Sequence, residues 1–281
     1  MSGKLLVASH LSALFPSPHP ITIFSTQKEF VKLLARNDST PPQHASYSML
    51  FHTPETGTIL LRVSHGGLML ELLSLSTELP PLRFDFPAQI LPSPSIVMWG
   101  SEELHVLAVT VVGSLYRIVL PVRADAPLWQ SESDPNRRWY REYVIQHPRP
   151  DLKGVVQVQG PYCVALSMPN GSLLRLDAEQ LGDDYDDDVW KETVFDHHSF
   201  LQSITSLLPT LHSGPPGASE IISMASHPQP TDIGNIWTLS RDRCLRLWTA
   251  RGGEIGKVSS LDAVKSNEVR GGLSPLGSIR K

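Results

Sequence analysis

Cysteine is scarce in this sequence, and its scarcity excludes two kinds of small-domain architecture. The 281 residues include only two cysteines, Cys163 and Cys244. Two cysteines cannot build a disulfide framework, and alone they cannot supply the four ligands of a structural zinc site. We therefore expect an intracellular protein from a reducing compartment, without a bound metal or a cofactor.

Long apolar runs are also missing. No stretch approaches the roughly 18 apolar residues that a membrane-spanning helix needs. The first fifteen residues carry one lysine and an apolar stretch broken by His10 and by serines, and no small-residue cleavage site follows. The sequence therefore predicts neither a signal peptide nor a transmembrane segment.

Neither a strong charge of one sign nor a catalytic motif is present. The 24 Lys+Arg against 28 Asp+Glu give a formal net charge of -4, which argues against a protein that grips nucleic-acid phosphates. The sequence contains no nucleophile elbow, phosphate-binding loop, dinucleotide fingerprint or zinc-protease motif. Ser64 to Gly67 could suggest an oxyanion loop, but its place between two alternating apolar runs predicts a hairpin turn. We expect no enzymatic activity and no small-molecule substrate.

The sequence contains enough apolar residues to form a core, and it contains many residues that favour turns. Apolar residues make up 41% and charged residues 19%, and there are 24 prolines and 19 glycines. This composition favours a folded, turn-rich protein. At about 100–200 residues per domain, the length allows one large domain or two small ones.

Four segments share one pattern, in which two alternating apolar runs flank a turn. Period-two alternation buries one face of a strand, so each segment predicts a β-hairpin. The segments are residues 59–73, 106–120, 162–176 and 236–248.

The turns of these hairpins are marked by residues that tolerate tight backbone conformations. They hold Gly66-Gly67, Gly113-Ser114, Asn170-Gly171 and the stretch 240–243. Glycine and asparagine accept the positive φ that hairpin turns require. We interpret Gly113, Asn170 and Gly171 as structural turn residues.

The spacing of the hairpins predicts an all-β fold with short helical insertions, namely a partial WD40-like β-propeller. The leucines after the turns (Leu68, Leu115, Leu173 and Leu245) are 47, 58 and 72 residues apart. A WD blade takes roughly 40–45 residues, so the excess predicts insertions. We expect the partial propeller over residues 1–250, with insertions at about 124–150 and 178–218. Residues 251–281 would form a weakly ordered tail or the start of a truncated next blade.

Two short helices and an incomplete ring complete this prediction. Residues 197–208 carry apolar side chains at helical spacing before Pro209, and residues 27–36 follow a capping-box pattern after a strand-like stretch at 21–24. Four hairpins do not comfortably close a propeller of about 4–8 blades, so the chain is expected to represent its N-terminal blades.

The hairpin sequences resemble one known family. LSRDRCLRLW at residues 239–248 looks like the end of a WD-type blade, in which Asp242 tightens the turn and Trp248 is structural. Together with TVVGSLYRIVLP at 110–121, NGSLLRL at 170–176 and SFLQSITSLLP at 199–209, it resembles a scaffold nucleoporin. Members of that family (the one-hundred-and-twenty/one-hundred-and-sixty type) form the large arm subunit of the Y-shaped outer-ring complex of the nuclear pore. The resemblance covers most of residues 59–249.

The resemblance implies a structural role at the nuclear envelope. The expected function is that of a scaffold propeller that supports Y-complex assembly and the transport of mRNA and protein. The expected partners are other Y-complex nucleoporins, without direct nucleic-acid binding. The alternative is a WD-like interaction module of another intracellular complex, such as a ubiquitin-ligase adaptor.

Several polar clusters have both a functional and a structural interpretation. The acidic run 183–188 could bind calcium, but it lacks the alternation of an EF-hand, so a solvated loop is favoured. His197 and His198 would point about 100° apart on a helix, which disfavours a shared metal. Residues 137–141 mix arginines with aromatics, which suits RNA stacking or a protein contact. We expect a protein contact, and the candidate contact residues are Arg138, Trp139, Tyr140, Phe200 and Leu201.

Overall fold

The fold was determined as a computed structural model. It describes residues 21–26, 46–76, 81–91, 94–122, 140–147, 154–157, 160–168, 170–179, 189–195, 219–226, 234–249 and 254–258. The helices expected at 27–36 and 197–208 and the acidic run at 183–188 lie outside these residues. Among the described residues, no helix is long and apolar enough to span a membrane.

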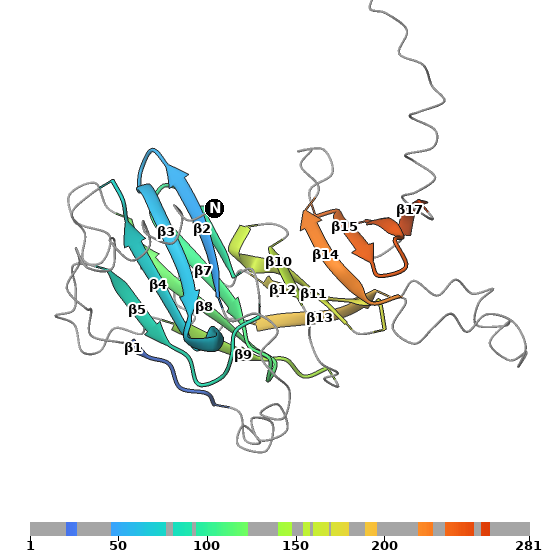
Figure 1. Ribbon diagram of the computed structural model, residues 1–281, viewed down its shortest axis with the longest axis horizontal. Helices are drawn as coiled ribbons and strands as arrows, with labels where there is room; N and C mark the ends of the chain where they lie inside the picture. The colour runs from blue at the N-terminus through green and yellow to red at the C-terminus, as the bar shows by residue number, and fades with distance from the viewer. Residues whose placement is uncertain are drawn as a thin grey trace, which may run out of the picture.

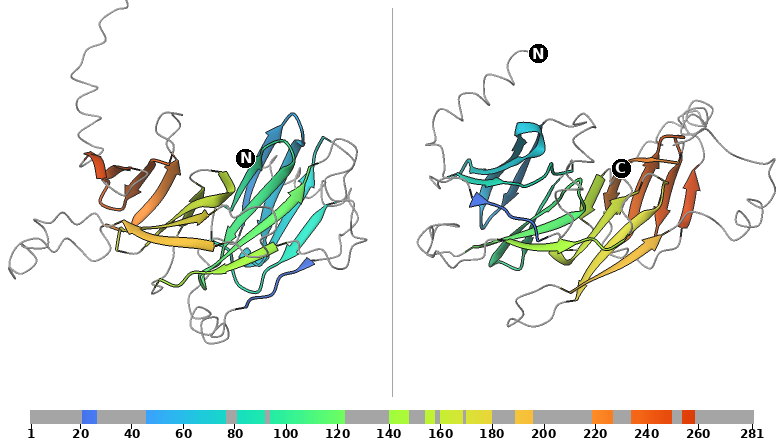
Figure 2. Two further views of the ribbon diagram at one scale, coloured as in Figure 1. Left: turned by 180° about the vertical axis from the view of Figure 1, so that it is seen from behind. Right: turned by 90° about the horizontal axis from the view of Figure 1, so that it is seen from below.

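The described strands form four sheets that follow one another in chain order (Figures 1 and 2). We call them blades 1 to 4. Blade 1 has the strand order β1-β5-β4-β3-β2, with β1 (Ile21–Thr22), β2 (Tyr47–Thr53), β3 (Gly57–Ser64), β4 (Met69–Ser74) and β5 (Leu82–Asp85). In this sheet β1 runs parallel to β5. The other neighbouring strands of blade 1 pair antiparallel.

Blades 2 to 4 are four-stranded antiparallel meanders. Blade 2 consists of β6 (Ser95–Trp99), β7 (Glu103–Val109), β8 (Ser114–Pro121) and β9 (Tyr140–Val144). Blade 3 consists of β10 (Gly154–Gln157), β11 (Cys163–Ser167), β12 (Leu173–Glu179) and β13 (Val189–Phe195). Blade 4 consists of β14 (Ile221–Ser226), β15 (Ile236–Ser240), β16 (Leu245–Trp248) and β17 (Glu254–Val258). Two short 3₁₀ turns, η1 (His65–Gly67) and η2 (Gly160–Tyr162), complete the described elements.

The four predicted hairpins are confirmed, and each one supplies two adjacent inner strands of a blade. They are β3–β4, β7–β8, β11–β12 and β15–β16. The Ser64 to Gly67 stretch is a hairpin turn, because η1 joins β3 to β4. These inner strands have neighbours on both edges. β7 and β11 are buried on both faces, whereas β3, β15 and β16 alternate between buried and half-buried residues, and both patterns place apolar residues in the sequence.

The outer strands lie where the sequence predicted insertions or a tail. β9 falls inside 124–150, β13 falls inside 178–218, and β17 pairs with β16 beyond residue 250. β9 and β13 carry mostly polar or half-buried side chains, so they lack the apolar periodicity on which the prediction depended. Glu254–Val258 is thus the outer strand of the blade 4 sheet. The division of the chain at residue 250 stays a prediction.

Three apolar clusters hold neighbouring blades face to face. The first joins blades 1 and 2, the second joins blades 2 and 3, and the third joins blades 3 and 4. Successive residues of a strand serve opposite clusters: Tyr116 packs toward blade 1, whereas Leu115 packs toward blade 3. Sheets stacked in sequence with alternating inner faces are the arrangement of a β-propeller, as predicted.

Candidate functional site at the blade turns

Three of the hairpin turns share one backbone geometry. In each, the first residue donates its N–H to the carbonyl four residues on, and the fourth residue donates back to the carbonyl of the first. The distances are 2.8 and 2.9 Å from Thr110 and Gly113, 3.0 and 3.0 Å from Met168 and Gly171, and 3.0 and 2.9 Å from Ser240 and Arg243. The fourth residue has a positive φ of 79° at Gly113, 85° at Gly171 and 62° at Arg243. Arg243 therefore occupies a position that the other two turns fill with glycine.

Side-chain oxygens brace two of these turns at the same position. The Oδ1 atoms of Asn170 and Asp242 each accept the N–H two residues on, from Ser172 and Cys244, both at 3.1 Å. Short polar side chains stabilise turns in this way. Asn170 and Gly171 lie in the turn of blade 3, and Gly113 lies in the turn of blade 2.

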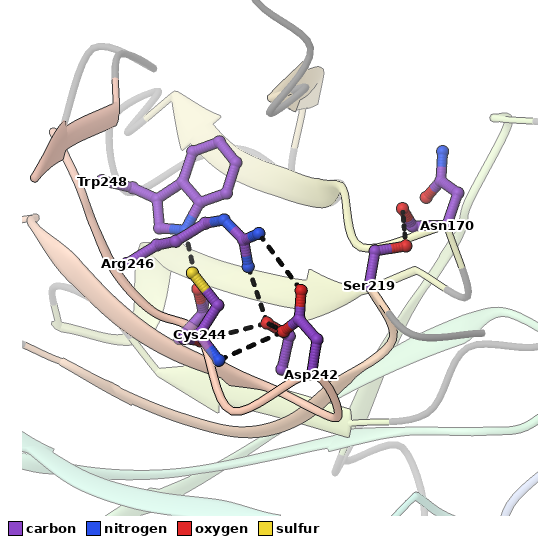
Figure 3. Close-up of polar contacts among 8 residues, drawn as sticks. Asn170, Ser219, Asp242, Cys244, Arg246 and Trp248 are labelled. Carbon is purple, nitrogen blue, oxygen red and sulfur yellow. Dashed lines mark hydrogen bonds and ion pairs between the residues drawn. The ribbon is translucent and has the colours of Figure 1, made fainter. Parts of the chain in front are cut away.

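Asp242 also lies at the centre of a polar network in blade 4 (Figure 3). The Ser240 hydroxyl donates to Asp242 Oδ1 at 2.5 Å and accepts from Arg246 at 2.6 Å. Arg246 lies 3.8 Å from the second carboxylate oxygen and is 4% exposed as a residue. Below the turn, the Trp248 indole N–H donates to Thr238 Oγ1 at 2.9 Å, and Trp248 is fully buried. These bonds connect the turn to both strands of the hairpin.

The blade 3 turn touches the segment that enters blade 4. The Ser219 hydroxyl donates to the carbonyl of Asn170 at 3.0 Å, as Figure 3 shows. A Cβ placed on Gly171 would clash with the Ser219 carbonyl oxygen. Two features therefore require glycine at position 171: its positive φ, and the close approach of the segment that enters blade 4.

Two buried arginines repeat a contact between neighbouring blades. Arg117 and Arg175 occupy the same place in the GSLYR and GSLLR stretches that follow the turns, and they are 4% and 8% exposed. The Arg117 guanidinium lies 5.0 Å from the ring centre of Tyr162 in η2, just before β11. Arg175 donates to the carbonyl of Gly234, just before β15, at 3.5 Å. Each arginine therefore reaches the approach to the second strand of the following blade.

Two outer-strand glutamates form a second repeated contact. Glu142 of β9 accepts hydrogen bonds from Ser25 Oγ at 2.8 Å, from Thr26 N at 2.5 Å and from Thr26 Oγ1 at 2.7 Å. Within blade 2 it also accepts from Ser114 Oγ at 2.6 Å and from the Tyr116 hydroxyl at 3.0 Å. This single carboxylate therefore ties the N-terminal segment to blade 2.

Glu192 of β13 does the same one blade later. It accepts from the Tyr143 hydroxyl at 2.8 Å and from the backbone N–H groups of Gln146 and His147 at 2.5 and 2.7 Å. Each glutamate therefore binds chain that borders the preceding blade.

The pKa values follow from these surroundings. Burial alone would raise the pKa of Glu142, but hydrogen bonds from Ser114, Thr26 and Ser25 outweigh it and hold the pKa below its ordinary value. Burial and the nearby carboxylates raise the pKa of Tyr116 and of Tyr143. Burial raises the pKa of Cys163 to about 12, although Arg175 opposes this shift. A thiol of that kind is not a nucleophile at neutral pH.

The candidate partner-contact residues are only partly described. Tyr140 is half-buried in β9, its hydroxyl accepts the N–H of Phe24 at 2.9 Å, and its ring packs edge-on against Tyr116. Arg138, Trp139, Phe200 and Leu201 lie outside the described residues. Among the described residues, no group of three or more His, Cys, Asp or Glu side chains is placed to hold a metal ion.

Sequence reasoning missed the inter-blade residues. The repeated GSLxR stretch was a signal that could have identified Arg117 and Arg175 as equivalent positions. For Glu142 and Glu192 no comparable signal exists, because their partners are distant in sequence.

Comparison with known families identifies this arrangement. Residues 57–275 match the family described as nucleoporin Nup120/160, beta-propeller domain, and they make up well over half of the chain. The chain belongs to the Nup120/160 nucleoporin family. The family is one of structural, non-catalytic propellers of the nuclear pore. This confirms the resemblance seen in the hairpin sequences.

Other comparisons add less to the Nup120/160 assignment. No curated protein matches the chain. Two similar solved structures are crystal structures of BBS1N in complex with ARL6DN, soaked with mercury and with lead, with TM-scores of 0.45 and 0.43. Each is 10% identical over 76% of this chain and 54% of the solved chain. The chain therefore spans about half the length of those solved chains.

Proposed function

We propose that this Nup120/160 propeller chain is a scaffold module of the Y-shaped outer-ring complex at the nuclear envelope. The observation that carries the proposal is the family match over residues 57–275. Three apolar clusters between consecutive blades support it, because they hold the described blades together as the firm body that a scaffold needs. The partners would be other Y-complex nucleoporins, bound through protein–protein contacts.

The partner contacts are proposed at the two insertions predicted from sequence, around Arg138, Trp139 and Tyr140 in the first and around Phe200 and Leu201, on the predicted helix, in the second. Arginine, tryptophan and tyrosine are enriched at the energetic centres of protein interfaces. The Tyr140 hydroxyl already binds Phe24 within the chain. We therefore expect Trp139→Ala to weaken partner binding while leaving the blades folded.

Localisation and assembly test the scaffold function. A fluorescently tagged chain should concentrate at the nuclear rim and should elute with purified outer-ring nucleoporins in gel filtration. Leu166→Asp, at a fully buried position between blades 2 and 3, should abolish both. Leu50→Asp, at a position that is 64% exposed, is the matched control and should preserve both. A folded chain that stays diffuse and binds none of these nucleoporins would contradict the proposal.

The transport role is a separate part of the proposal. Depletion of the protein should cause polyadenylated RNA and an import reporter to accumulate on the wrong side of the nuclear envelope. Restoration by the Leu50→Asp chain but not by the Leu166→Asp chain would attribute the defect to the folded propeller. Normal RNA and reporter distributions after depletion would argue against this role.

A further inference from the structure

The N-terminal segment 21–26 joins blade 1 to blade 2. β1 pairs with β5, and the Ile23 N–H donates to the Asp85 carbonyl at 2.9 Å. The Ile23 side chain is 1% exposed and packs into the cluster between the two blades. The Phe24 N–H then reaches across to the Tyr140 hydroxyl at 2.9 Å. The segment therefore binds one blade through its start and the other through its end.

The hold on blade 2 is concentrated in one charged group. The Ser25 hydroxyl, the Thr26 hydroxyl and the Thr26 N–H all donate to the Glu142 carboxylate. The same carboxylate accepts from two groups of its own blade, so blade 2 fixes its position. Any group that replaces the Thr26 hydroxyl proton with negative charge would face this carboxylate directly.

The equivalent glutamate of blade 3 lacks this sensitivity. Glu192 holds its segment through two backbone N–H groups and through the Tyr143 hydroxyl. Thr26, in contrast, is an exposed residue with an aliphatic hydroxyl, four residues beyond the end of β1. Of the two ties, only the Glu142 tie therefore presents an exposed serine or threonine hydroxyl.

We propose that Thr26 is a phosphorylation site that controls the release of residues 21–26 from blade 2. A protein kinase would transfer the γ-phosphoryl group of ATP. The Thr26 Oγ1–P bond forms, the bond from that phosphorus to the bridging oxygen breaks to give ADP, and the hydroxyl proton passes to the base of the kinase. The inference does not depend on the proposed function.

Electrostatics gives the direction of the effect. The phosphate carries about -1.5 to -2 charge at neutral pH and has only acceptor oxygens toward an ionised carboxylate. The modified Thr26 loses its hydroxyl bond to Glu142 and gains a repulsion at hydrogen-bond distance. Kinase access uses transient opening of the segment, and the phosphate then prevents the segment from rebinding.

Hydrogen exchange on the full chain tests the release. Phosphothreonine is placed at position 26 by genetic encoding, and amide exchange is measured at Ile23 and along β5. The expected result is exchange about tenfold faster at Ile23, with exchange at Gln146 and His147 unchanged. Unchanged exchange at Ile23 would overturn the proposal.

Two variants separate charge from loss of the hydroxyl. Thr26→Val removes the donor without adding charge, so its exchange should stay close to that of the unmodified chain. Phosphothreonine in a Glu142→Gln chain should accelerate exchange less than it does beside Glu142, because the amide can donate to the phosphate. Equal acceleration by valine, or an undiminished effect of the phosphate in the Glu142→Gln chain, would show that charge repulsion is not the cause.

Occupancy in cells is tested by mass spectrometry of the peptide that contains Ser25 and Thr26. Phosphatase inhibitors preserve the modified form, and fragment ions assign the phosphate to one hydroxyl. Phosphate on Thr26 supports the proposal. Its absence from a well-sampled peptide, or its presence on Ser25 alone, rejects the assignment of the site.

Discussion

At the scale of single residues, the blade turns depend on positions where a side chain is barely tolerated. Gly171 has a φ of 85° and lies against the Ser219 carbonyl, whereas Gly66 has a φ of 66° with open space around its missing Cβ. The two glycines therefore separate conformational strain from steric contact.

Gly171→Ala should destabilise the protein by about 2–4 kcal/mol, because left-handed strain adds to overpacking against the next blade. Gly66→Ala, the matched control, should cost about 1 kcal/mol from strain alone. Denaturant unfolding of both variants measures the difference. Equal losses would mean that the contact with Ser219 contributes nothing.

Glu142 predicts a pH dependence of stability. Its folded-state pKa is lowered from the ordinary value of 4.5, so its contribution is complete above pH 4.5 and is lost as the pH falls toward the folded-state pKa. The wild-type chain should therefore lose stability below about pH 4.5 more steeply than Glu142→Gln. Unfolding free energies measured from pH 6 downward test this, and parallel profiles would contradict it.

At the scale of elements, outer strands carry the polar ties and middle strands carry the core. β9 and β13 each place one glutamate where it can bind chain bordering the preceding blade, while β7, β8, β11 and β12 supply buried apolar faces. These two outer strands therefore form hydrogen bonds between blades in addition to pairing within their own sheets.

Glu192→Ala should destabilise the protein by about 1–3 kcal/mol, because it removes the acceptor of three hydrogen bonds. Amide exchange should rise at Gln146 and His147 and not at Thr26. Glu220→Ala is the control, since its partner Arg241 is 65% exposed and such surface pairs contribute at most about 1 kcal/mol. A Glu192→Ala loss no larger than that of the control would reject the fastening role.

At the scale of the whole molecule, each described blade packs on its neighbours in chain order. The three apolar clusters each join two consecutive blades. In such an arrangement, a substitution that destabilises one repeated unit lowers the stability mainly of that unit and of its direct neighbours. A destabilising substitution in the cluster between blades 3 and 4 should therefore leave blade 1 folded.

Trp248→Ala should cost about 3–5 kcal/mol, because the fully buried indole leaves a cavity in the cluster between blades 3 and 4. Hydrogen exchange should rise across β14–β16 while β3 and β4 stay protected. Trp248→Phe keeps part of the packing but loses the bond to Thr238 and some buried volume, so its cost should be smaller, at about 1–3 kcal/mol. Uniform loss of protection in all blades would show that the chain unfolds as one unit.

The sequence by itself determined the four hairpins, their turns and the family. Those features are local: alternation of apolar residues identifies a strand, and glycine or asparagine identifies a turn that needs positive φ. Gly113, Asn170, Gly171 and Asp242 were visible for this reason. The turn at Arg243 was visible only through its neighbours, because arginine carries no signal for a left-handed conformation.

Only the tertiary structure decided how the blades are fastened. The outer strands β9 and β13 show no clear apolar alternation, because polar and half-buried side chains predominate in them. Glu142 meets Thr26, which is 116 residues away, and Glu192 meets Gln146, which is 46 residues away. Hydrogen bonds over such separations depend on which blade packs beside which, and that order is a property of the folded chain.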